Sequence, residues 1–248
     1  MGLVEPVADA PAAVATLADG ERALVVADYH AGIEGYFRRA GIEAASRADE
    51  RLDRLVGLLE AVAPDRVVFL GDLAHWIGRP AGRELAELER LVEVVTARAE
   101  VLLVKGNHDG EFEEALDVPV SDSAGVRLGD VGFVHGHTWP DRAVLEADVV
   151  CMGHEHPAVR IEDAVGGARV ERVWLRGPLA GSAFERTGVE PAAVEGELVV
   201  FPAFNELAGS TWVNVEGRDF LAPFLPDGLV DGEAYLLDGT RLGPYRAV

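Results

Sequence analysis

Five short apolar segments, each followed at once by a polar cluster, constrain the fold of this 248-residue chain more than any other feature. The first three segments are apolar and rich in β-branched residues, as buried strands are: 23–27, 66–70 and 101–104. Between them, apolar residues recur at helical spacing from Ser46, a plausible N-cap, to Pro64, and again from about Pro80. Strands that alternate with helices predict parallel βαβ units, so we expect an α/β protein.

Beyond Val120 the pattern changes to short strand-like runs separated by glycine. We expect strands at 126–128, 131–134, 149–152, 169–175, 194–201 and 211–215. No repeat, low-complexity segment or linker divides the chain. The sequence therefore predicts a single domain over 1–248, in which 28–156 carries the polar clusters and 157–248 adds further strands.

The polar clusters follow the predicted strands in a fixed order. They are Asp28-x-His30, Gly71-Asp72, Gly106-Asn107-His108-Asp109, His135-Gly136-His137 and Gly153-His154-x-His156. All seven histidines lie in or beside these clusters, and none follows residue 156. Because ligands of α/β proteins bind at the carboxyl ends of the strands, we expect the clusters to converge on one site.

Imidazoles, carboxylates and one amide are ligands for Mn, Fe, Zn or Co and not for soft thiolate metals. The single cysteine, Cys151, excludes a cysteine-based zinc module and is expected to be a small buried apolar residue. So many donors would over-supply one ion, which favours a pair with a bridging carboxylate, and Asp72 is the natural bridge. Two ions about 3.5–4 Å apart stabilise both the entering and the leaving oxygen in a displacement at phosphorus.

As an ordered set, the clusters resemble the calcineurin-like metallophosphoesterase superfamily over residues 28–156. The resemblance implies a sandwich of two β-sheets flanked by helices, with a di-metal site at the carboxyl ends of the strands. Three local segments are similar to the SbcD-related archaeal phosphoesterases and the DNA ligase-associated, PdeM-like phosphoesterases. They are FRRAG at 37–41, LGDLAH at 70–75 and PAFNELAGS at 202–210.

The resemblance also implies roles for single residues. It gives two ligand sets joined by Asp72: Asp28, His30 and His156 for one ion, and Asn107, His135 and His154 for the other. His108 would act on the phosphate as general acid or charge stabiliser, and Asp109 would hold the His108 ring. The expected cofactors are two divalent ions, Mn²⁺ first, with Zn²⁺, Fe²⁺ or Ni²⁺ as alternatives.

Other residues near the clusters are candidates for binding substrate. His75 stands where many superfamily members carry a second Asp, and His137 is the second histidine of its cluster. Arg38 and Arg39 could bind a phosphate in bidentate fashion, or they are solvated charges on a helix. Trp76 and Trp139 could wall the pocket or stack a base, although ordinary packing is the favoured interpretation.

The predicted function is metal-dependent hydrolysis of a phosphoester by attack of a metal-bridging hydroxide. The closer resemblance favours a diester, with nucleotides or nucleic-acid derivatives among the candidate substrates. A DNA-end nuclease of the SbcD type is an alternative, opposed by the net charge and the lack of a basic stripe. A catalytically silent metal-binding scaffold is another, opposed by the presence of Asp28, Asp72, Asn107 and His108.

The charge is strongly and evenly acidic. The chain has 43 acidic against 22 basic residues, a net charge of −21, and a single lysine, Lys105. Such a surface repels itself, but at about 1 M salt the Debye length falls to about 3 Å and the repulsion is screened. This favours a halophilic, archaeal-like protein over an ordinary acidic one. With no apolar run of about 18 residues and no basic leader, we expect it in the cytoplasm, away from membranes.

We predict that the protein becomes more stable between low and molar KCl, because salt screens its self-repulsion. Thermal melting followed by circular dichroism across this range should give a rising Tm. A Tm that is flat or falls would identify an ordinary acidic protein.

Overall fold

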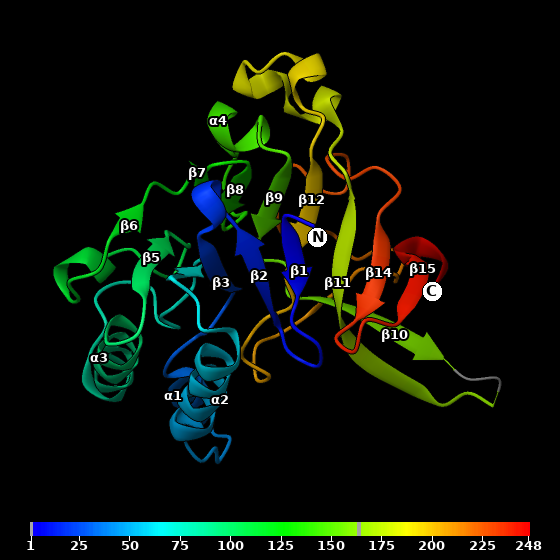
Figure 1. Ribbon diagram of the computed structural model, residues 1–248. Helices are drawn as coiled ribbons and strands as arrows, with labels where there is room; N and C mark the ends of the chain where they lie inside the picture. Colours follow the sequence, from blue (N-terminus) through cyan, green and yellow to red (C-terminus); the bar gives the residue numbers. More distant parts are fainter. Residues whose placement is uncertain (1, 163–164) are drawn as a thin grey trace.

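The computed structural model describes residues 2–162 and 165–248 and contains two β-sheets with helices beside them (Figure 1). The first sheet has the order β1 (Val4–Pro6), β2 (Ala12–Thr16), β3 (Arg22–Val26), β4 (Arg66–Phe69), β5 (Glu100–Val104) and β6 (Val120–Ser121). Strands β3 to β6 run parallel, whereas β1 and β2 join β3 in antiparallel fashion.

The second sheet has nine strands in the part of the chain that the structure describes. Its order is β13 (Thr211–Trp212), β10 (Pro157–Glu162), β11 (Ala168–Pro178), β12 (Glu197–Val200), β9 (Val149–Met152), β8 (Val131–Val134) and β7 (Val126–Leu128). Two further strands extend it from β11: β14 (Glu233–Leu236) and β15 (Arg241–Pro244). Within this sheet β8, β9 and β12 are parallel neighbours.

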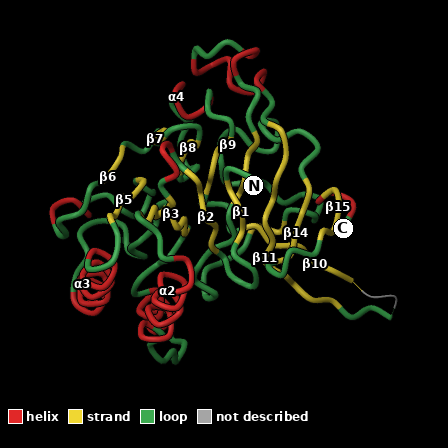
Figure 2. Tube along the Cα trace, viewed as in Figure 1, coloured by secondary structure: helices red, strands yellow, loops and turns green. Residues whose placement is uncertain are grey.

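The α-helices are α1 (Ile33–Arg39), α2 (Ala48–Val62), α3 (Gly82–Thr96) and the short α4 (Arg142–Leu145). Short 3₁₀ helices occur at Ala18–Gly20, Phe112–Glu114, Gly181–Thr187, Pro191–Ala193 and Tyr245–Ala247. Figure 2 shows α2 and α3 together at one side of the strands. None of the helices in the described part of the chain is long and apolar enough to cross a membrane.

The alternation of side chains along β3 explains the layers. Leu24 packs in one buried cluster with Leu55 of α2 and Leu91 of α3, whereas Val25 packs in another with Cys151 of the second sheet. Successive residues of a strand point to opposite faces, so β3 contacts helices on one face and the other sheet on the other. The prediction that Cys151 is a small buried residue is confirmed, and burial raises the pKa of its thiol.

The order of strands brings the polar clusters together. They follow the carboxyl ends of β3, β4, β5, β8 and β9, which are parallel neighbours within their sheets. The core shared by the two sheets holds these strands side by side. The predicted sandwich of two sheets flanked by helices is therefore confirmed.

Several elements differ from the sequence-based expectation. Strands β1, β2, β6, β10, β14 and β15 and helices α1 and α4 are additional. Helix α1 follows Gly32, which has φ of 77° and no side-chain cap to mark a start. Helix α2 begins after Arg47 and not after Ser46, whose hydroxyl accepts a long 3.4 Å bond from the Ala48 amide. The strands expected at 194–201 and 211–215 shorten to β12 and β13.

Candidate metal centre

Within residues 2–162 and 165–248, three groups of donor atoms lie together at the carboxyl ends of the strands. In each group the nitrogen and oxygen atoms are within 4.8 Å of one another: Asp28, His30 and His156; Asp72, His135 and His154; His30, His75 and His108. The first group has the same members as one ligand set implied by the sequence. The second contains the other set's two histidines with Asp72, and the Asn107 Oδ1 lies 3.1 Å from His135 Nε2.

Two buried carboxylates occupy the middle of these groups. Asp28 is 0 % and Asp72 3 % exposed. Both carboxylates pair with histidines: His156 Nε2 lies 3.3 Å from Asp28, and His135 Nε2 lies 3.4 Å from Asp72. Burial opposes ionisation of Asp28, but attraction to His156 keeps its pKa below the ordinary value. Buried carboxylates need nearby positive charge, so this donor set fits cations.

Three histidines present the same nitrogen to the centre. The Nδ1 atom of His135 lies 2.7 Å from the Leu70 carbonyl, that of His156 lies 2.8 Å from the Gly209 carbonyl, and that of His108 bonds the His75 carbonyl. Because a carbonyl only accepts, Nδ1 carries the proton in each ring and donates it. The lone pair of a neutral ring is then on Nε2, and the ring orientation is fixed, as in metal-binding histidines.

The pKa values of three predicted ligands, His30, His154 and His135, bear on metal binding. Burial lowers the pKa of His30 to about 3 and that of His154 to about 4, so both are neutral near pH 7. Burial also disfavours charge on His135, but Asp72 and Asp28 raise its pKa to about 9. A metal ion competes with that proton, because an imidazole binds a metal only when deprotonated.

The backbone is strained where the donors are. Five of the nine non-glycine residues with positive φ in the described chain are predicted ligands: Asp28, His30, Asp72, His154 and His156, with φ between 44° and 69°. A left-handed conformation costs a residue other than glycine about 1–3 kcal/mol and persists only where its surroundings impose it. Strain concentrated on these residues indicates a functional site.

Two motif glycines allow the strand ends to approach one another. A Cβ on Gly71, which has φ of 78°, would overlap Nδ1 of His135, and a Cβ on Gly106 would overlap the Asp72 carboxylate. The Gly-Asp and Gly-Asn-His-Asp motifs therefore need glycine because a donor from a neighbouring segment occupies the space of a side chain.

The expectation that Asp109 holds the His108 ring is wrong. The Asp109 carboxylate is buried and accepts bonds from the amides of Leu73 at 3.0 Å, Ala74 at 3.2 Å and Gly106 at 3.0 Å. The ring of His108 is held instead by the His75 carbonyl. Asp109 therefore fastens the loop after β4 to the loop after β5.

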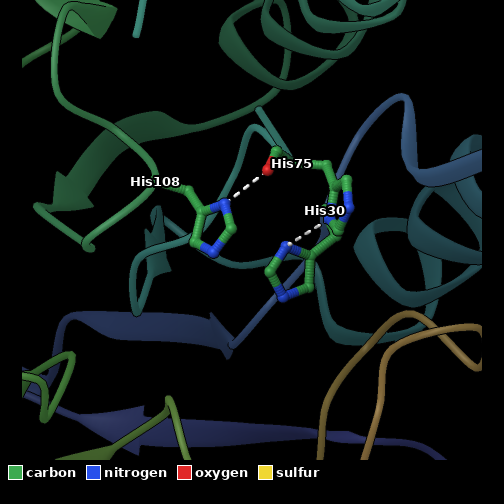
Figure 3. A group of neighbouring side chains, drawn as sticks. All are labelled: His30, His75 and His108. Carbon is green, nitrogen blue, oxygen red and sulfur yellow. Dashed lines mark hydrogen bonds between the residues drawn. The ribbon is translucent and has the colours of Figure 1, made fainter. Parts of the chain in front are cut away.

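His75 reaches the candidate centre. Its Nδ1 lies 3.5 Å from Nδ1 of His30, and its ring stacks on that of His108 with centroids 5.6 Å apart (Figure 3). The ring of His137 lies 5.3 Å from that of His135, between centroids. His137 and Asn107 line a cleft of about 560 Å³ together with Lys105, Ser121 and Ser123.

The remaining candidates lie outside the donor groups. Arg38 donates to the Ala44 carbonyl, and Arg39 lies over the Trp76 ring, 4.0 Å from its centroid. Trp139 packs against Phe184 and Phe224, as the packing interpretation expects.

Sequence reasoning missed one loop that orients the donors. Asn205 is 2 % exposed, and its Nδ2 donates to the carbonyls of Tyr29 at 2.9 Å and His30 at 3.2 Å. The same loop supplies the Gly209 carbonyl that holds His156. Both residues lie in the PAFNELAGS segment, where an asparagine directly after the apolar Ala203 and Phe204 was the available signal.

Residues 22–189 match the calcineurin-like phosphoesterase superfamily domain. The chain belongs to this superfamily. Membership and the His/Asp donor groups identify a metal-dependent hydrolase of phosphoesters. No curated protein matches the sequence.

Two solved structures are reported by the structural comparison. The Pseudomonas putida nuclease MPE has a TM-score of 0.57 and 22 % identity over 96 % of this chain and 100 % of that one. The Escherichia coli phosphoesterase YfcE has a TM-score of 0.37 and 22 % identity over 57 % of this chain and 74 % of that one. At this identity, the likeness to the nuclease MPE supports the fold alone.

We predict that Asn205→Ala weakens metal binding about 10- to 100-fold, because the turn carrying Asp28 and His30 loses its support. Calorimetric titration with Mn²⁺ measures this directly. Asn214→Ala is the matched control, since the Asn214 side chain also bridges backbone groups, those of Arg160 and Val248. Equal Mn²⁺ affinity in the two variants would contradict a positioning role for Asn205.

Proposed function

We propose that the protein is a phosphodiesterase that works with two divalent metal ions, Mn²⁺ first among them. The observation that carries this proposal is the pair of donor groups around the buried carboxylates Asp28 and Asp72. One ion would be held by Asp28, His30 and His156, and the other by Asn107, His135 and His154, with Asp72 between them. When bound, such a pair supplies positive charge that polarises the phosphoryl group and activates water.

We assign the proton chemistry to His108. Its Nδ1 is fixed by the His75 carbonyl, and its Nε2 faces the centre 3.7 Å from the Asp72 carboxylate. A protonated Nε2 at this place donates to the leaving oxygen as the ester bond breaks. His75, stacked on the same ring, limits how far the imidazole turns and lies within reach of a phosphate oxygen.

The diester preference rests on the two flanks of the centre. A diester has two substituents on its phosphate, and the centre is bordered both by the His75 ring and by the cleft that His137 and Asn107 line. A DNA-end nuclease is the second candidate, favoured by the likeness to a fold whose solved member is described as a nuclease. The net charge of −21 opposes long-range attraction of a polyanion unless salt screens it.

We further propose that residues 1–248 act as one domain, since a core shared by both sheets supports the centre. The dispersed acidic charge supports a cytoplasm rich in salt as its location. The complete set of donors argues against a silent scaffold.

The direct test is hydrolysis of an aryl phosphodiester beside the matching monoester. Metal-stripped protein in molar salt receives Mn²⁺, Zn²⁺, Ni²⁺ or Mg²⁺ separately. The proposal expects faster hydrolysis of the diester, with Mn²⁺ the most effective ion. Faster hydrolysis of the monoester with every metal would overturn the diester assignment.

We predict that Asp72→Ala abolishes activity and removes bound metal while the circular dichroism spectrum stays native, because the ligand between the two ions is lost. Elemental analysis should give two ions per wild-type chain and fewer in the variant. Asp72→Asn keeps the shape of the side chain and removes its charge, so comparison of the two variants separates the effect of charge on metal binding from the effect of size. One metal ion per wild-type chain, with the same metal content in Asp72→Ala, would contradict the two-metal proposal.

We predict that His108→Gln keeps the metal content of the wild type but lowers kcat about 10²- to 10⁴-fold. The loss should be larger for an alkyl leaving group than for nitrophenolate, because nitrophenolate departs without a proton. Metal analysis and kcat for the two esters test this. Loss of metal would make His108 a ligand, and equal losses for both esters would make it a packing residue.

A further inference from the structure

A pair of aromatic rings borders the His75 side of the centre. The Tyr36 ring on α1 lies 5.5 Å from the His75 ring and 6.2 Å from the Trp76 ring, between centroids. His75 in turn lies 5.2 Å from His30 and 5.6 Å from His108 (Figure 3). A single imidazole therefore separates Tyr36 from the donors of the candidate centre.

Tyr36 is placed differently from the other large rings of this protein. Tyr29, Phe69, Phe133 and Phe204 are at most 2 % exposed, whereas Tyr36 is 51 % exposed. The contacts of Tyr36 with Phe37, His75 and Trp76 are edge-on or tilted, so no ring stacks face to face on it. An exposed aromatic ring beside a catalytic centre offers a surface on which a flat ligand can stack.

The same patch carries positive charge. The Arg39 guanidinium lies over the Trp76 ring at 4.0 Å, and Arg38 follows Tyr36 on α1 by two residues. Among the described residues neither arginine forms an ion pair with a carboxylate, although acidic residues outnumber basic ones 43 to 22. A guanidinium group beside an exposed ring near the centre can bind the phosphate of an anionic ligand.

We propose that Tyr36, Trp76 and Arg39 form a platform that stacks a nucleobase whose phosphate lies at the metal centre. Aromatic rings interleaved with arginine bind unpaired bases and their phosphates. This rests on the proposed phosphodiesterase function and narrows its substrate to a nucleotide diester with an unpaired base. A dinucleotide and a single strand share this chemistry.

The test compares base-bearing with abasic substrates in molar salt with Mn²⁺. The substrates are an oligothymidylate, an abasic strand of equal length, and a thymidine dinucleotide. In the wild type, KM for the oligothymidylate should be about 5- to 100-fold lower than for the abasic strand. In Tyr36→Leu this ratio should collapse toward one, whereas Tyr36→Phe, which keeps the ring, and Ile77→Ala, an exposed apolar neighbour at 76 %, should keep it.

Equal KM values for the two strands in the wild type would overturn the platform. So would a Tyr36→Leu variant that raises both KM values by the same factor, because the ring would then act on the sugar-phosphate backbone or on the site as a whole and not on the base. The dinucleotide distinguishes the two substrates that share this chemistry. If its KM is as far below that of the abasic strand as the KM of the oligothymidylate is, one stacked base suffices. If its KM is closer to that of the abasic strand, the platform serves longer strands. Fluorescence anisotropy of labelled strands tests base-dependent binding even if no diester is hydrolysed, so failure of the proposed function remains distinguishable.

Discussion

The burial of two carboxylates where the sheets meet is the constraint on which the rest of the structure depends. Asp28 and Asp72 lie at the ends of neighbouring parallel strands, within reach of histidines that come from both sheets. Two negative charges that lie close together and are shielded from solvent are stable only with compensating positive charge. The histidines, the glycines that let them approach and the strained turns all serve this arrangement.

Most of the fold and the location of the site could be predicted from sequence, because each donor follows directly on an apolar strand. Parallel strands end at one edge, so local patterns such as those at Asp28 and Asp72 carry long-range information. The N-terminal strands and α1 were not predictable in this way, because small residues and an uncapped start at Gly32 leave no local signal. Their formation depends on pairing with β3 and packing on the sheet.

The finer roles depend on contacts between distant segments. The partner of His156 is a carbonyl 53 residues away, and that of His135 is 65 residues away, so neither can be read from a motif. Asp109 illustrates the same limit: next to His108 in sequence, it binds amides of another loop in space. Spacing identifies the donors of a centre, whereas the tertiary fold decides what orients them.

The carbonyls that orient the three histidines belong to Leu70, His75 and Gly209. A peptide carbonyl is present whatever side chain its residue carries, so substitution cannot delete it while the chain keeps its path. Substitutions at these three positions therefore leave the hydrogen bond to the imidazole in place. A ring held by a carboxylate side chain would lose its bond when that residue is substituted. Homologous sequences could diverge at residue 209 and still present the same imidazole nitrogen to the same ion.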